Sequence, residues 1–153
     1  MNRFGAILLI FVLMSSGVIA DEQSSVKRAV TELSRDGLEL RQSAKEIPVC
    51  ILQALRRWMH RPFTIVNSDE SFPPVTDIRH SGDGRFRLFF FSELSPETTL
   101  VCFEDDASLG ISNRAFFFSK RGNECVVKYQ FALRRPVRSI KEVRTAIIET
   151  VQR

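Results

Sequence analysis

Histidine and cysteine are scarce in this chain of 153 residues, which has two histidines and three cysteines. None of them falls in a C-x₂-C or H-E-x-x-H spacing, so the sequence predicts no metal site. The glycine patterns that cradle phosphates or expose a serine nucleophile, G-x-G-x-x-G and G-x-S-x-G, are also missing. We therefore expect no cofactor, and the only thiol-based catalytic candidates are weak ones: Cys50 with His60 or His80.

Cys50 lies at the start of a predicted helix, where the helix dipole favours a thiolate. It also lies in an apolar run, VCILQAL, and such surroundings are more typical of a buried or bridged cysteine. Paired acids such as Asp69 and Glu70 offer a carboxylate site instead, but adjacent acids in loops are common. A small extracytoplasmic hydrolase with a Cys/His or carboxylate site is therefore an alternative, not the leading prediction.

Long apolar runs are few. One run, from Phe4 to Met14, follows Arg3 and precedes small residues that suit cleavage after Ala20. It is too short to cross a bilayer comfortably, and this arrangement is typical of a secretory signal peptide. We expect a signal peptide over 1–20, a single mature domain over 21–153, no membrane span after cleavage, and a secreted or periplasmic location.

A strong charge excess is missing as well. The net charge is +4, and it falls to +3 when Arg3 is removed with the signal peptide. This is low for a nucleic-acid-binding domain, and export also argues against a nucleic-acid partner. Basic clusters do occur at 56–61, 79–87 and 134–138, so a polyanion-binding module is a third alternative.

Export would place Cys50, Cys102 and Cys125 where disulfides form. In a simple antiparallel meander another strand would separate the strands of Cys102 and Cys125. Their Cα atoms would then lie about 9–10 Å apart, too far for a bond. Cys50 would be able to reach either of them, and a sheet of another strand order would allow Cys102–Cys125. The sequence leaves the pairing open.

Hydrophobic periodicity outlines the secondary structure. Apolar residues recur every three or four positions over 26–47 and 49–59, which predicts two N-terminal helices. A third such stripe follows Pro136, with Ser139 as the N-cap. A short strand is expected over 62–66, and a period of two predicts strands at about 85–91, 99–104, 114–120 and 124–133. We predict an α+β fold, with N-terminal helices and a C-terminal helix packed on an antiparallel sheet of about four to five strands.

Phenylalanine is abundant, and six of the 13 form the triplets RLFFFSE (87–93) and RAFFFSK (114–120). Side chains alternate between the faces of a strand, so each triplet must be divided between two faces. One face is predicted to be a core face that carries Phe86, Leu88, Phe90, Phe116, Phe118, Val127, Tyr129 and Phe131. Phe89, Phe91 and Phe117 are left on the other face.

Several aromatic side chains on a second face exceed the apolar area that a monomer usually exposes. Either helices of the same chain cover both faces, or the second face is a partner or homodimer surface. In the latter case Phe89, Phe91 and Phe117 would be anchors, with Arg85 and Arg87 at the rim. We predict an exported, non-catalytic small binding protein, such as an inhibitor, immunity or assembly-type factor acting on another envelope or secreted protein.

Overall fold

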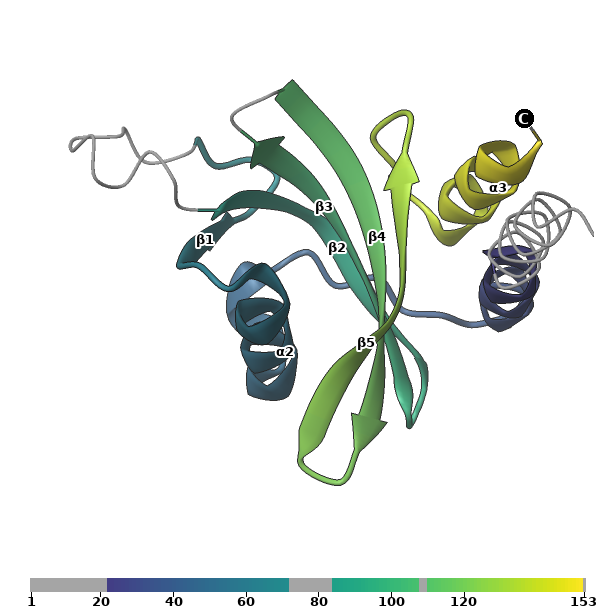
Figure 1. Cartoon of the computed structure of the whole chain (residues 1–153), viewed down its shortest axis with the longest axis horizontal. Helices are drawn as coiled ribbons and strands as arrows, with labels where there is room; N and C mark the ends of the chain where they lie inside the picture. Colours follow the sequence, from purple (N-terminus) through teal and green to yellow (C-terminus); the bar gives the residue numbers. More distant parts are fainter. Residues whose placement is uncertain (1–21, 72–83, 108–109, 153) are drawn as a thin grey trace, which may run out of the picture.

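The computed structural model describes residues 22–71, 84–107 and 110–152 (Figure 1). A helix over 22–32 comes first. It is followed by η1 (Ala44–Glu46), α2 (Val49–Met59), β1 (Phe63–Val66), β2 (Gly84–Ser95), β3 (Thr98–Ala107), β4 (Gly110–Arg121), β5 (Glu124–Leu133) and α3 (Ile140–Val151). The predicted α+β class is confirmed. The predicted signal peptide over 1–20 lies outside the described residues.

The five strands form one sheet in sequence order, β1-β2-β3-β4-β5. β2 to β5 are an antiparallel meander, as predicted, whereas β1 pairs parallel to β2 and makes the sheet mixed. Residues 67–83 separate β1 from β2, and a connection of this length lets both strands start from the same end of the sheet. The predicted two-residue turn between β4 and β5 is present, with Gly122 at a φ of 61°.

The first helix is much shorter than the apolar stripe predicted. It ends near residue 32, and Gly37 adopts a left-handed φ of 71° a few residues later. The chain then runs along the sheet, where Arg41 exchanges two backbone hydrogen bonds with Phe91, of 2.9 and 2.8 Å. The prediction of one helix over 26–47 was therefore wrong: the helix stops at residue 32, and the left-handed Gly37, five residues later, turns the chain in a conformation that glycine adopts readily.

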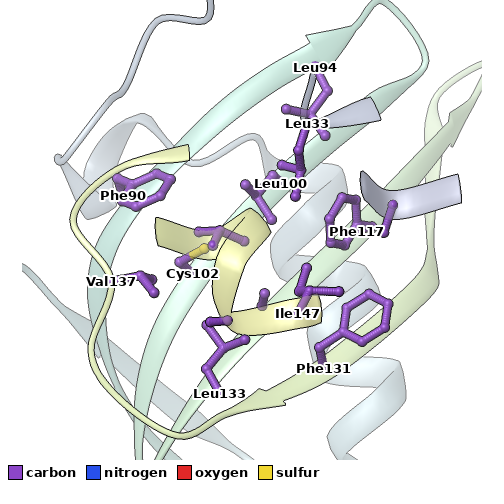
Figure 2. Packing of buried hydrophobic residues seen from close by; sticks show 14 residues of the cluster. Leu33, Phe90, Leu94, Leu100, Cys102, Phe117, Phe131, Leu133, Val137 and Ile147 are labelled. Atoms are coloured by element: carbon purple, nitrogen blue, oxygen red, sulfur yellow. The ribbon is translucent and has the colours of Figure 1, made fainter. Parts of the chain in front are cut away.

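Helices lie on both sides of the sheet (Figure 1). We call the side against α2 the α2 face, and its buried residues are Ile47, Ile51, Ala54, Leu55, Phe86, Leu88, Phe91, Val101, Phe103, Phe116, Phe118 and Cys125. The opposite side, the α3 face, is covered by α3 and the 22–32 helix. Figure 2 shows its cluster, in which Leu33, Phe90, Leu94, Leu100, Cys102, Phe117, Phe131, Leu133, Val137 and Ile147 meet.

Two β-bulges change the predicted assignment of side chains to faces. In β2 the register shifts between Leu88 and Phe90, so Phe90 lies on the α3 face and Phe91 on the α2 face. In β5 the extra residue is Lys128, and Tyr129 therefore pairs with Phe117 instead of Phe116. An inserted residue reverses the alternation beyond it. The predicted core face was thus right up to each bulge and wrong after it.

A disulfide joins Cys50 of α2 to Cys125 of β5, with the Cα atoms 5.1 Å apart and 75 residues between them in sequence. Cys102 is buried and free, on the α3 face of a strand that β4 separates from β5. The meander thus excludes the Cys102–Cys125 alternative. Closing a loop of this length restricts the unfolded chain and stabilises the fold by about 4 kcal/mol.

No helix within the described ranges is both long and apolar enough to cross a membrane.

Candidate functional site

Helices of the chain itself bury most of the predicted anchor residues. Phe91 and Phe117 are each 0% exposed, on opposite faces of the sheet. Of the two triplets only Phe89 is left half-buried, at the edge of the α3-face cluster. For Phe91 and Phe117, the alternative in which helices of the same chain cover both faces is therefore the one observed. The prediction that these two residues are exposed anchors was wrong. Phe89 is the triplet residue that a ligand can still touch.

The position of Phe89 follows from the bulge in β2. Leu88 pairs with Phe103 and Phe90 with Cys102, so Phe89 has no partner residue on β3. A bulge bends the strand and redirects a side chain, and bulges are common beside binding sites. Phe90 takes the interior position on the α3 face, and Phe89 lies beside it without being needed to fill the core.

Phe89 lies in a groove of about 450 Å³. Five segments of the chain contribute to its walls: the stretch before η1, the residues after β1, β2, β3, and the connection between β5 and α3. The lining residues are Gln42, Ser68, Arg87, Phe89, Glu104, Pro136, Val137 and Arg138. We call this the Phe89 groove. A concave site with one aromatic ring and a few converging polar groups is the usual form of a binding pocket.

The charges in the Phe89 groove are partly neutralised. Nη1 of Arg87 lies 3.3 and 3.2 Å from the two carboxylate oxygens of Glu104. The two side chains are 28% and 14% exposed, which makes this a semi-buried, charge-assisted pair. Arg138 is exposed, and its guanidinium forms no ion pair within the described ranges. The groove therefore carries one open positive charge beside an apolar floor.

A second charged pair lies on the α2 face, away from the groove. Nε of Arg114 is 3.1 Å from Oδ2 of Asp105, whose side chain is 7% exposed. The Arg114 guanidinium also lies over the Trp58 ring, 5.9 Å from its centroid. The indole therefore shields this ion pair at the end of α2. The pair joins β3 to β4, Arg114 also contacts α2 through Trp58, and neither residue lines the groove.

The structure does not bring the weak catalytic candidates together. Cys50 is bonded to Cys125 and so has no thiolate. His60 is exposed and ends α2 with a left-handed φ of 55°, ten residues and about 15 Å along the helix from Cys50. His80 lies outside the described residues. The remaining cysteine, Cys102, is buried, and burial raises the pKa of its thiol far above the ordinary value.

The sequence identified part of the groove. Phe89 and Arg87 were predicted partner-binding residues, and both line it, whereas Arg85 does not. Arg138 belongs to the basic cluster at 134–138, which the sequence analysis noted without linking it to Phe89. Gln42, Ser68 and Glu104 could not be assigned to this groove from the sequence, because they are distant in the chain and converge only in the fold. Within the described ranges no group of acidic, histidine or cysteine side chains is arranged to hold a metal ion.

Comparison with protein-family models, with curated proteins and with solved structures found no match to this chain.

Proposed function

We propose that this chain is a small exported binding protein without catalytic activity, which holds part of another envelope or secreted protein in the Phe89 groove. The observation that carries the proposal is the bulge in β2, which leaves Phe89 half-buried in a groove of about 450 Å³. A half-buried aromatic ring with polar groups around it is the usual composition of an interface hot spot.

Two further features support export and a binding role. The Cys50–Cys125 disulfide suits an oxidising compartment outside the cytoplasm. The arrangement of the cysteines does not favour the Cys/His hydrolase, since two of them are bonded to each other and Cys102 is buried. An exported chain should lose residues 1–20, so N-terminal sequencing of the protein recovered outside the cytoplasm should begin at Asp21. A mature protein that retains Met1 would contradict the predicted signal cleavage.

Matched alanine variants test the binding role. Phe89 and Phe63 are both half-buried, but Phe63 packs on the α2 face and is not in the groove. The folded wild type, Phe89→Ala and Phe63→Ala would be used as baits in envelope extract, and the affinity of the purified partner measured for each. We expect Phe89→Ala to weaken binding at least tenfold and Phe63→Ala to change it less than twofold.

Two results would contradict the proposal. One is a partner that binds Phe89→Ala as tightly as the wild type. The other is a chain that stays monomeric and retains no partner from the extract at any bait concentration. If the retained partner is a second copy of this chain, and Phe89→Ala releases it, the groove is a homodimer surface.

A further inference from the structure

The wall of the Phe89 groove formed by the β5–α3 connection continues into a strongly basic surface. Between residues 134 and 144 five cations are exposed, and Glu142 is the one acid of that stretch. The cations are Arg134, Arg135, Arg138, Lys141 and Arg144. Two of them have partners nearby, since Arg134 donates to the Glu149 carbonyl at 3.4 Å and Arg135 lies 3.8 Å from the Glu149 carboxylate. The β5–α3 connection and the first turns of α3 therefore carry an excess of positive charge, which attracts anions.

Arg138 is the member of this surface that reaches the groove. Its backbone N–H donates to the Glu142 carboxylate at 2.7 Å, and Glu142 N–H donates to the Ser139 hydroxyl at 3.2 Å. These capping bonds fix the backbone of residue 138 at the start of α3. The Arg138 guanidinium is thus mounted on an ordered backbone and is open to a ligand in the groove.

The apolar residues in the groove favour a ligand that carries an apolar group next to its anionic group. Phe89 is half-buried there and Val137 is fully buried, so a side chain that covers the ring would bury apolar area. Glu104 is already bound by Arg87 and does not need a cation from the ligand. The ligand that fits carries a carboxylate for Arg138 and an aromatic or aliphatic group for Phe89.

We propose that the occupant of the Phe89 groove is an acidic peptide segment of the partner protein, with a carboxylate on Arg138 and an apolar side chain on Phe89. This inference rests on the proposed function and adds the chemistry of the partner. A phosphate polymer fits less well, because it has no apolar group to cover the Phe89 ring.

Short blocked peptides provide the probes. The acidic peptide is acetyl-DEFED-amide, with acetyl-SSFSS-amide and acetyl-KKFKK-amide as neutral and basic counterparts and polyphosphate as the polymer. Each is titrated into the folded chain while the backbone amide chemical shifts are recorded by NMR. We expect the acidic peptide to shift the amides of Phe89, Glu104 and Val137, and to bind at least tenfold more tightly than the basic one.

A matched pair of charge reversals locates the contact. Arg138→Glu, just before α3, should weaken binding of the acidic peptide at least tenfold, whereas Arg144→Glu, in α3 but outside the groove lining, should change its affinity less than threefold. Ser139 and Glu142 remain in both variants, so the capping of α3 is retained.

The remaining outcomes separate this inference from the proposed function. If the neutral or basic peptide binds at Phe89 as tightly as the acidic one, the acidic class is wrong and the binding role stands. If polyphosphate binds more tightly than the acidic peptide, and both charge reversals weaken it equally, the surface is a polyanion site and the inference is overturned. If no peptide shifts the amides around Phe89, and Phe89→Ala also leaves partner binding unchanged, both proposals fail.

Discussion

The α2 face and the α3 face bury similar kinds of residue but hold their helices differently. On the α2 face one helix is attached by the Cys50–Cys125 disulfide, and Arg57 donates to the Cys125 carbonyl at 2.7 Å. Aromatic rings meet edge to face beneath it, as in Trp58 and Phe116 with centroids 5.1 Å apart. This face is fastened covalently at one edge of the sheet.

The α3 face is closed by α3 and the 22–32 helix, which are attached by packing and a few polar contacts. Lys128 lies 2.6 Å from the Glu32 carboxylate, and Arg35 donates to the Leu94 carbonyl at 2.8 Å. Within the described ranges no disulfide joins these helices to the sheet. The Phe89 groove opens on this face. The groove thus lies on the face whose covering helices are held to the sheet without a disulfide, and we propose that this leaves room for adjustment to a ligand.

The largest expected effect tests whether the two faces are equally important for folding. Phe116 and Phe117 are adjacent in sequence, are both fully buried, and point to opposite faces. Replacing either by Ala should lower the free energy of unfolding by about 3–5 kcal/mol, whereas Phe89→Ala should cost only about 1 kcal/mol. Urea denaturation of the three variants measures this. A small cost for only one of the two buried residues would show that its face contributes little to the core.

The second prediction concerns the covalent fastening. The double variant Cys50→Ala/Cys125→Ala should lose about 2–4 kcal/mol of unfolding free energy, because the unfolded chain regains its freedom. In the wild type, amides of α3 should exchange with solvent at a lower opening free energy than amides of α2. Native-state hydrogen exchange of both proteins checks this. If α2 already opens as easily as α3 with the disulfide intact, the proposed difference between the faces is wrong.

The third prediction uses Cys102 as a reporter of the α3 face. Burial raises the pKa of its thiol in the folded state, whereas the thiol of the unfolded chain has a pKa of about 8.5. The unfolded chain therefore releases this proton first. The stabilisation is complete below about pH 8.5 and is lost as pH rises above it, by roughly 1.4 kcal/mol per pH unit.

Cys102→Ala should remove that slope, although its stability at neutral pH will be lower because a side chain has been deleted from the core. Unfolding free energies of both proteins from pH 7 to 10 give the comparison. Equal slopes above pH 8.5, or rapid modification of Cys102 by a thiol reagent in the folded protein, would mean that the α3 face admits solvent to this residue.

The smallest effect is expected for the polar contact between β5 and the 22–32 helix. Lys128 and Glu32 are partly exposed, with 33% and 18% of their side-chain areas accessible. An ion pair at this exposure contributes about 0.2–1 kcal/mol. Lys128→Ala should therefore change the thermal midpoint by only a few degrees. A loss comparable to that of Phe117→Ala would show that charge, rather than apolar packing, holds this helix.

Elements with one clear period were predictable from the sequence. α2 and α3 came from stripes at helical spacing, and Ser139 caps α3 as expected by accepting a hydrogen bond from Glu142 N–H. The strands of the meander came from alternation and turn residues. The parallel pairing of β1 with β2 was not predictable, because the four residues of β1 do not determine whether it runs parallel or antiparallel to its neighbour.

Face assignment and the groove required information that alternation lacks. A bulge adds one residue without a compositional mark, so Phe90 and Tyr129 were placed on the wrong faces. The apolar residues over 26–47 keep helical spacing beyond residue 32, where the helix ends, so spacing alone did not show its end. Alternation placed Phe89 on the second face, and its role in partner binding stays a prediction. Its neighbours Gln42 and Glu104 lie in segments that only the fold brings to it.

The sequence separation of the disulfide has a consequence for the order of folding. Each strand of the meander pairs with the next strand along the chain, and such local contacts close short loops and form early. Cys50 and Cys125, by contrast, are 75 residues apart, and docking of α2 on β5 brings their sulfurs together in the fold. We therefore expect oxidation to follow assembly of the sheet. In oxidative refolding, the rate at which free thiols disappear would then report how fast α2 docks on the sheet after the meander has formed.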